Sequence, residues 1–513
     1  MLIIDDNKIN DVCPISSLVQ YKMSKLRAGI LAAVIFFLFV KSSNGGVTDN
    51  VVEQFAFEKK GEIVCNLPDS LKKEIAGYQS TVNKIIDGIV NGKFKGKTWD
   101  ALAELTDTFG PRMSCSDSLE KAIDYAVDGM TKGGLENVHT ENFSAPWWVR
   151  GYENCEMVTP WKRNLPILGL GSTVGTPRGG IIADVIAVES FDEFKNFTED
   201  QVKGKIVVFV PEWKGYGTTV VYRSEAASVA SRKGAVAALI RSIAPFSINS
   251  PHTGHQNYAD GVKKIPVAAL TVEDAEMILR MYRRGQQVQI NLEMADQNKG
   301  DCVTRNTIGE LQGSKEKNTS VVVVSGHMDS WDVGVGAMDD GGGMMISWKA
   351  VEFLKAMGLR PKRTIRAILW AAEEQGYVGA RQYMADHKEK EQKEFSFFME
   401  SDIGTFEPRG LDFDGNADGA CIVKEVLKLM APLNTTEFNT PTDGGPDISL
   451  WTSRGFPGAS LLNKNEKYFW YHHSNGDRMD VEDKDTLDKC AALWASAAYV
   501  IADLSVNIPR TLT

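Results

Sequence analysis

The stretch VVVVSGHMDSWDVGVGAMDDGGG covers residues 321–343 and joins an apolar run to a loop rich in His and Asp. Four consecutive valines predict a strand that is buried on both faces, as in a parallel sheet. Directly after this strand come His327 and Asp329, and Asp339 follows in a glycine-rich turn. The apolar spacing then predicts a helix over 343–357. We therefore expect a strand, a loop carrying metal-ligand residue types, and a helix.

The same alternation continues to the end of the chain. Runs at 364–371 and 395–399 predict further strands, and runs at 420–430 and 487–504 predict helices. Strands that alternate with helices predict an α/β fold with a mainly parallel central sheet flanked by helices.

Acidic residues and histidines follow the predicted strands of this last third. They are Glu373, Glu374, Asp402, His472 and His473. Loops at the carboxyl ends of parallel strands face one crevice, so we expect these side chains to meet there. Carboxylates gathered in this way repel one another unless cations neutralise them. Histidine mixed with carboxylate suits zinc, and the excess of carboxylate suits two ions that share a bridging ligand.

The earlier parts of the chain have a different pattern of predicted helices and strands. Residues 68–150 predict helices, over 71–90, 99–109 and 116–130. From about 160 to 297 the pattern changes to short β-rich runs with two helix-like segments, which predicts a small α/β module with its own core. Within that module, Pro251 and Gly254 make the segment from His252 to His255 a loop, and we expect a surface loop rather than a metal site.

Composition and charge exclude several classes of protein. The chain has 513 residues, 43% of them hydrophobic and 24% charged, which is ordinary for a globular protein and excludes a mostly disordered or fibrous one. The formal net charge is −10 and there is no basic block. This argues against nucleic acid or an anionic membrane as the main partner.

The N-terminal region predicts export. Thirteen uncharged apolar residues at 28–40 follow Lys25 and Arg27, and small residues come next. At about 1.5 Å per residue the run spans roughly 20 Å, short of the roughly 30 Å core of a bilayer. A secretory signal peptide is favoured over a short signal anchor, so we expect a secreted or lysosomal protein without stable membrane insertion. Four sequons agree with this route, at Asn142, Asn196, Asn318 and Asn434.

The order His-x-Asp, Asp-Asp-Gly, Glu-Glu, Ser-Asp and His-x-x-x-Asp resembles the co-catalytic zinc exopeptidases related to aminopeptidases and glutamate carboxypeptidases. The stretches that carry this likeness are SGHMDSWDVGVGAMDDGGG, WAAEEQG, MESDIGTF, FWYHHSNGD, LIRSIAPFSINSPHTG and KIPVAALTVEDAEM. The resemblance covers nearly all of the chain after the signal. It implies a homodimer that acts on dipeptides or short peptides with free termini.

The resemblance also implies a zinc exopeptidase fold interrupted by a protease-associated α/β domain. The expected parts are an upstream extension and signal peptide at 1–47, the first part of the catalytic domain at 48–159, the inserted domain at 160–297, and the second part of the catalytic domain, with the dizinc site, at 298–513.

Site roles follow from the resemblance residue by residue. It implies that His327 and Asp402 hold one zinc ion, that Glu374 and His473 hold the other, and that Asp339 bridges the two. The neighbouring His472 stays an alternative ligand; His473 is preferred because Asp477 lies four residues further on.

The resemblance assigns the remaining roles to residues beside these ligands. Glu373 is the expected general base, and Asp329 is expected to hydrogen-bond the far nitrogen of His327 and fix its tautomer. Trp331 and Tyr471 either line the pocket or pack beside it.

Two other functions stay open at this point. One is an aminopeptidase that takes longer peptides, and the other is a receptor-like binding protein that kept the fold but lost its metals. The intact set of ligands and base argues against the second.

Six cysteines remain once the signal region is removed. Because the two ends of an inserted domain are expected to lie close together, Cys155 and Cys302 are predicted to form a disulfide, with two separate buried thiols as the alternative. A bond between Cys421 and Cys490 is less favoured, since each lies in a predicted helix.

Overall fold

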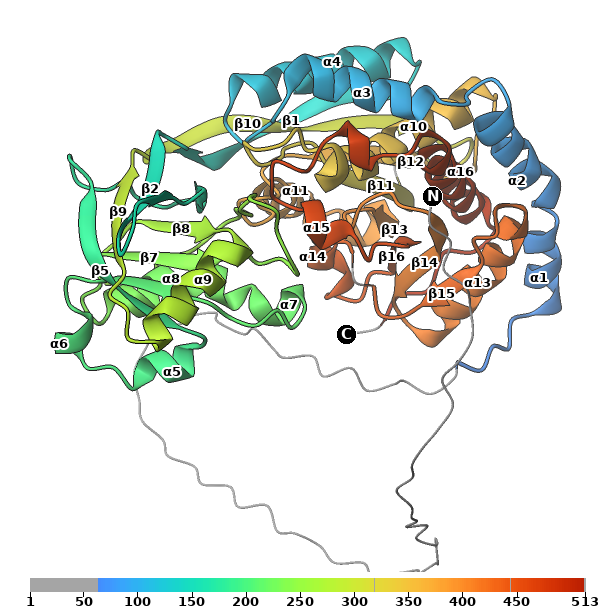
Figure 1. Ribbon diagram of the computed structural model, residues 1–513. Coiled ribbons are helices and arrows are strands. Elements are labelled where there is room, and N and C mark those ends of the chain that lie inside the picture. Colours follow the sequence, from blue (N-terminus) through green and yellow to red (C-terminus); the bar gives the residue numbers. More distant parts are fainter. Residues whose placement is uncertain (1–62, 318, 443, 512–513) are drawn as a thin grey trace, which may run out of the picture. The chain divides into compact units, whose positions relative to one another are not determined.

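The computed structural model describes residues 63–317, 319–442 and 444–511, which build two eight-stranded sheets (Figure 1). In spatial order the first sheet consists of β1 (Glu136–Val149), β10 (Gln297–Leu311), β12 (Ile365–Trp370), β11 (Val321–His327), β13 (Phe395–Glu400), β16 (Gly458–Asn463), β14 (Pro408–Asp414) and β15 (Glu437–Asn439). Its four central strands, β12, β11, β13 and β16, are parallel neighbours. The predicted α/β fold with a mainly parallel centre is confirmed.

The register of the central strands brings their carboxyl ends to one edge. Ser325 on β11 lies opposite Ile368 on β12 and Glu400 on β13. Glu400 in turn lies opposite Ser460 on β16. The segments that follow these strands therefore begin at the same edge of the sheet, as the sequence predicted.

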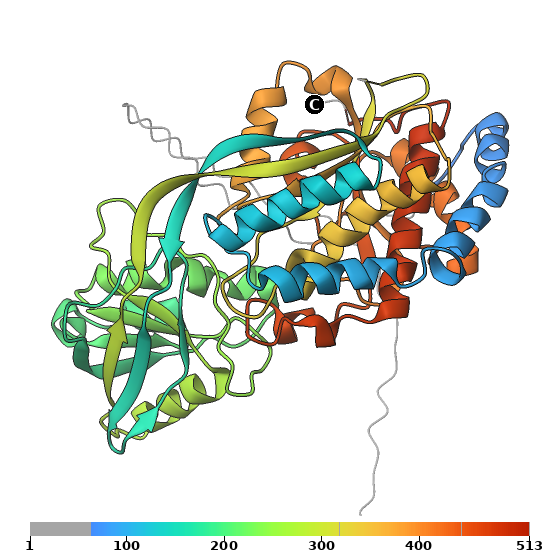
Figure 2. The ribbon, with the colours of Figure 1, turned by 90° about the horizontal axis from the view of Figure 1, so that it is seen from above.

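Helices cover both faces of this sheet (Figure 2). Val322 and Val324 of β11 pack in one core, and Val321 and Val323 pack in the other, because successive side chains of a strand point to opposite faces. The first core includes α4 (Asp117–Lys132), α10 (Gly342–Ala356), α13 (Ala417–Leu427) and α16 (Lys484–Asp503). The second includes α11 (Val378–His387) and α14 (Ser449–Thr452).

The N-terminal helices form as predicted, with one interruption. They are α1 (Asp69–Ala76), α2 (Gln79–Ile86), α3 (Lys97–Phe109) and α4. The predicted run at 71–90 is broken at Gly77, where α1 ends. Helix α4 begins after Ser116, whose side chain accepts a hydrogen bond from the backbone N–H of Leu119 as an N-cap.

The second sheet is the predicted α/β module with its own cores. In spatial order it consists of β3 (Arg163–Asn164), β2 (Glu153–Thr159), β9 (Gln289–Met294), β5 (Ile181–Val188), β6 (Ile206–Phe209), β7 (Ala237–Arg241), β8 (Val267–Leu270) and β4 (Ile167–Gly169). Its two faces are covered by α9 (Val272–Arg283) on one side and α8 (Val221–Ser231) on the other.

Two long antiparallel strands connect the sheets, and the sequence analysis did not predict them. Strands β1 and β10 pair from Glu136 opposite Glu310 to Val149 opposite Gln297. The chain leaves the first sheet along β1 and returns along β10 (Figures 1 and 2). Many of their side chains are exposed or half-buried, so the strands lack the apolar runs that marked the others.

This two-stranded ribbon explains why the predicted disulfide between Cys155 and Cys302 is wrong. Cys302 lies on β10 opposite Ala145 and bonds to Cys115, whereas Cys155 lies on β2 opposite Leu292 and is a buried free thiol. The segment between β1 and β10 does leave and re-enter the first sheet at paired positions. The pairing runs along the ribbon, however, so the neighbour of residue 302 is residue 145 and not residue 155.

The remaining cysteines also differ from the less favoured expectation. Cys421 on α13 bonds to Cys65, near the start of the described chain. Cys490 on α16 is a buried free thiol whose Sγ lies 3.3 Å from the carbonyl oxygen of Phe406.

The features expected for export are only partly covered by the structure. The apolar run at 28–40 and the sequon at Asn318 lie outside the described residues. The other three sequon asparagines, Asn142, Asn196 and Asn434, are exposed. Among the described helices, none combines the length and the apolarity needed to cross a membrane.

Candidate metal centre

The structure brings the predicted site residues together at the carboxyl ends of the central strands. His327 ends β11, Glu373 and Glu374 follow β12, and Asp402 follows β13. Asp339 lies in the turn before α10, and His473 follows α15 (Tyr468–Tyr471). The metal-ligand candidates among them are buried at the residue level, none more than 9% exposed.

His327 forms one half of the cluster. Its Nε2 atom lies 3.2 Å from Oδ1 of Asp402 and 3.3 Å from Oδ1 of Asp339. Its Nδ1 atom lies 2.8 Å from the backbone carbonyl oxygen of Asp329. A carbonyl oxygen only accepts hydrogen bonds, so Nδ1 carries a proton, and Nε2, which faces the two carboxylates, is the nitrogen left for a metal ion. This is the tautomer that a metal ligand needs.

His473 forms the other half. Its Nε2 atom lies 3.0 Å from Oε2 of Glu374 and 3.3 Å from Oδ2 of Asp339. Its Nδ1 atom lies 3.2 Å from the backbone carbonyl oxygen of Thr253. The two carboxylate oxygens of Asp339 thus face different histidines, which is the arrangement of a bridging ligand.

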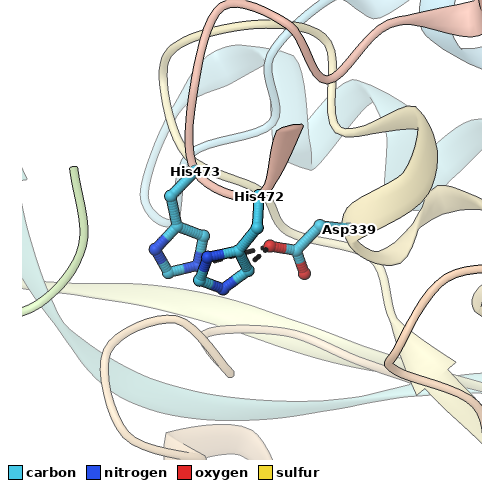
Figure 3. Close-up of side chains that lie close together, drawn as sticks. All are labelled: Asp339, His472 and His473. Atoms are coloured by element: carbon cyan, nitrogen blue, oxygen red, sulfur yellow. Dashed lines mark ion pairs between the residues drawn. The ribbon is translucent and has the colours of Figure 1, made fainter. Parts of the chain in front are cut away.

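His472 also turns toward Asp339. Figure 3 shows the imidazoles of His472 and His473 side by side, both directed at that carboxylate, and their ring centroids lie 3.5 Å apart. The Nε2 atom of His472 is 3.7 Å from Oδ2 of Asp339, farther than the 3.3 Å of His473. The ion pair with Glu374 belongs to His473. These distances favour His473 as the ligand.

Glu373 stands beside the first half of the cluster. Its Oε2 atom lies 3.9 Å from Nε2 of His327, and its side chain is 11% exposed. Burial raises the pKa of Glu373 well above its ordinary value. A carboxylate that is poorly solvated and next to the ligands is placed to exchange a proton with a molecule bound there.

Asp329 contacts His327 through a different group from the one expected. Its backbone carbonyl, rather than its carboxylate, lies against Nδ1 of His327; the carboxylate Oδ1 is 3.7 Å away. The carboxylate instead accepts hydrogen bonds from the backbone N–H groups of Glu373, at 3.2 Å, and Glu374, at 3.4 Å. The side chain of Asp329 therefore fixes the turn on which both glutamates stand.

The donor set fits zinc. Burial raises the pKa of Glu374 and of Asp402, because the charged form of each is poorly solvated in the buried cluster. Oδ2 of Asp339 and Oε1 of Glu374 are buried and have no hydrogen-bond partner among the described residues. Imidazole nitrogens together with carboxylate oxygens are the ligands of zinc in hydrolytic sites, and a shared carboxylate suits two ions.

Two supporting residues hold the loops that carry these ligands. Asp477 accepts hydrogen bonds from the backbone N–H groups of Met338, at 2.8 Å, and Asp339, at 3.2 Å. Arg112 is fully buried and donates to the carbonyl oxygens of Met328, at 2.7 Å, and Gly336, at 2.8 Å. Nothing in the local pattern around Arg112 marked it, because its partners are more than 200 residues away.

The two aromatic candidates occupy different positions relative to the cluster. Trp331 is 2% exposed and lines the small space at the cluster together with Asp339, Glu374 and His473. Tyr471 is half-buried and packs beside Trp470, with ring centroids 6.5 Å apart.

The segment from His252 to His255 is a loop, as predicted, but not a surface loop. His252 is 2% exposed and Thr253 is 1% exposed. The loop is buried because it packs on the backbone of His472 and His473, with the N–H of Thr253 donating to the carbonyl oxygen of His473 at 2.9 Å.

Comparisons with known proteins agree with this geometry. The model of peptidase family M28 matches residues 306–498. Carboxypeptidase Q from Mus musculus is 46% identical over 482 residues, which cover 93% of this chain and 99% of the mouse protein. The solved structure of a peptidase M28 precursor from Shewanella amazonensis SB2B has a TM-score of 0.81 and 30% identity, and the match covers 86% of this chain and 100% of that chain.

A zinc aminopeptidase from Bacillus subtilis shares the fold at 21% identity, with a TM-score of 0.63 over 81% of this chain and 99% of that chain. The sequence match to carboxypeptidase Q extends through both sheets, and the family model spans all five predicted ligands. The chain therefore belongs to peptidase family M28.

Proposed function

We propose that this zinc metallopeptidase is a dizinc exopeptidase that hydrolyses dipeptides or short peptides with free termini, as its resemblance to plasma glutamate carboxypeptidase, or carboxypeptidase Q, implies. The observation that supports it best is the position of Asp339. One of its carboxylate oxygens faces His327 and the other faces His473. A carboxylate shared in this way serves two metal ions.

The proposed ligands divide into two sets around Asp339. His327 and Asp402 hold one zinc ion, and His473 and Glu374 hold the other. When bound, the two ions supply a water of lowered pKa and polarise the scissile carbonyl. The ligand set is buried, and charge interactions are stronger in a poorly solvated site than at the surface.

Glu373 carries out the proton transfers. Its carboxylate takes a proton from the attacking water and passes it to the amine that leaves. Asp329 supports this role indirectly. Its carboxylate accepts a hydrogen bond from the backbone N–H of Glu373 and so fixes the backbone from which the Glu373 side chain extends.

A purified, metal-loaded protein tests the proposal. Metal analysis should find two zinc ions per chain, and a panel of dipeptides should be cleaved when both termini are free. Comparing peptides whose N-terminus or C-terminus is blocked then shows which free terminus the enzyme requires. Cleavage of long peptides from the N-terminus would instead favour an aminopeptidase. Tight binding of peptides without hydrolysis or bound metal would favour the receptor-like alternative.

We also propose that the protein is exported as a glycosylated homodimer, secreted or delivered to lysosomes. Two disulfides and three exposed sequons support export. Sequencing the N-terminus of secreted material should find a start between residues 46 and 50. A terminus that still carries residues 31–40 would indicate an anchor.

The division of the chain expected from the resemblance, 1–47, 48–159, 160–297 and 298–513, is likewise proposed, with the second sheet as an inserted protease-associated domain and with the border at 159/160 moved to before Glu153. The separate cores of that sheet support an independent domain. Strand β2 also belongs to this sheet, so the domain includes residues from Glu153 onward. Limited proteolysis should cut near these borders.

A further inference from the structure

The loop at 251–255 belongs to the second sheet's part of the chain, yet it lies against the proposed ligand pair of the first. Thr253 makes two contacts with His473. Its N–H donates to the carbonyl oxygen of His473 at 2.9 Å, and its own carbonyl oxygen lies 3.2 Å from Nδ1 of His473. The ligand residue is thus held at its backbone and at its ring by one peptide segment.

The ring contact selects the state that binds metal. Nδ1 of His473 lies 3.2 Å from the carbonyl oxygen of Thr253, which can only accept, and 3.4 Å from Nη1 of Arg223, which can only donate. With its proton on Nδ1 the ring bonds to the nearer Thr253, and Nε2, which faces Glu374 and Asp339, is the nitrogen left for a metal ion. Fixing the tautomer and the ring orientation of a ligating histidine in this way commonly contributes tenfold to a hundredfold to metal affinity.

His252 supplies the second attachment. Its Nδ1 atom lies 2.6 Å from the carbonyl oxygen of His472, so it donates the hydrogen bond. Its backbone N–H donates to Oγ of Ser242 at 2.9 Å, and that hydroxyl donates to the carbonyl oxygen of Leu270 at the end of β8. A chain of hydrogen bonds therefore connects the second sheet to the residue before His473.

The loop itself is held rigidly. Gly254 has a φ of +142°, and a Cβ atom there would come within 2.4 Å of the guanidinium of Arg223. Arg223 packs across this glycine and donates to the carbonyl oxygen of His255 at 3.2 Å. The hydroxyl of Thr253 donates to the carbonyl oxygen of Gly169 at 2.8 Å. The loop is fixed on the second sheet's side before it reaches the ligands.

We propose that the 251–255 loop is a positioning element for the ligand His473, and that His252 is the positioning residue on which this depends. The inserted part of the chain then sets the affinity of one of the two metal positions. This inference rests on the proposed dizinc site and adds to it a residue from outside the first sheet.

The test compares two histidines of the same loop. His252→Phe keeps an aromatic ring and removes the donor to His472. His255→Ala is the matched control, because the His255 side chain contacts Asn257 and Ser172 and reaches neither ligand. Each full-length protein is freed of metal and titrated with Zn²⁺ against a competing chelator, and Co²⁺ spectra report the ligand field of each position.

We expect His252→Phe to bind one metal about 10–100-fold more weakly, with the other position within about threefold of the wild type. Its Co²⁺ spectrum should change for the weak position alone, and His255→Ala should match the wild type. Two metals of wild-type affinity in His252→Phe would overturn the inference, as would an equal loss at both positions.

A second variant keeps the test decisive if His252→Phe does not fold. His252→Asn retains a hydrogen-bond donor on a shorter side chain, whereas His252→Ala has none. His252→Asn should therefore lose Zn²⁺ affinity at the same single position, and by less than His252→Ala. Equal losses in these two variants would refute a role for the donor. A wild-type protein that binds no metal would instead refute the proposed function itself.

Discussion

Replacing Glu373 by Gln exchanges one oxygen of the proposed base for an amide nitrogen and leaves the shape of the side chain nearly unchanged. Among the described residues, the Glu373 carboxylate makes no hydrogen bond to the fold, and its nearest charged partner is Nε2 of His327 at 3.9 Å. Glu373 lies outside both sets of proposed ligands. The substitution should therefore remove proton transfer and leave folding and metal content intact.

The expected magnitude follows from the role. Loss of a positioned general base lowers the rate by about two to four decades. At about 1.4 kcal/mol per decade this raises the activation free energy by about 3–5 kcal/mol. The loss should appear in kcat, since the side chain is not assigned to substrate binding.

Glu374→Gln is the matched comparison, because it makes the same chemical change one residue away. Oε2 of Glu374 lies 3.0 Å from Nε2 of His473, and the side chain is a proposed ligand. This variant should lose metal from one position. Dipeptide hydrolysis, measured together with zinc content, separates the two effects.

Two results would refute the reasoning. Near-normal turnover in Glu373→Gln would show that another group moves the proton. Loss of zinc from Glu373→Gln, with zinc retained in Glu374→Gln, would show that the two glutamates have exchanged roles.

Three further predictions concern the fold. Arg112→Met removes the donor of two buried hydrogen bonds to carbonyl oxygens, at about 1–3 kcal/mol each, and of two partly buried ones, so denaturant unfolding should show a loss of at least about 2 kcal/mol, and a loss below 1 kcal/mol would contradict this. Burial opposes the charge on His387, but two glutamates that accept its hydrogen bonds raise its pKa to about 9, above the ordinary 6.5. Its stabilising effect is therefore complete below about pH 6.5 and lost as the pH rises to about 9; the urea midpoint should fall over this range in the wild type and less in His387→Gln. Non-reducing peptide mapping should recover Cys115 joined to Cys302 and leave Cys155 free to alkylation after unfolding, and a peptide joining Cys155 to Cys302 would contradict the structure.

Much of the first sheet and of the metal centre was predictable because the information is local. Strand β11 begins with a run of four valines with one core on each face, and the proposed ligand His327 ends the strand three residues after the last valine. Glu373, Glu374 and Asp402 stand after strands of the same type. The parallel arrangement then requires their loops to meet at one edge.

The ribbon of β1 and β10 was not predictable in the same way. Most positions of β1 and of the first half of β10 are exposed or half-buried, and the buried end of β10 mixes polar with apolar residues, so no apolar run marks either strand. The disulfide prediction failed for this reason. Without the ribbon's register, the position opposite Cys302 could not be known.

The sequence by itself determined the α/β class, which strands the proposed ligands follow along the chain, and the residue types that gather at the candidate site. Each of these depends on residue types within a few positions of one another. Only the tertiary structure decided which cysteines pair, that Arg112 holds the ligand loop, and that a loop near residue 252 supports His473. Those contacts join residues more than 180 positions apart, and their geometry depends on how distant segments of the chain pack against one another, which no local pattern of side chains records.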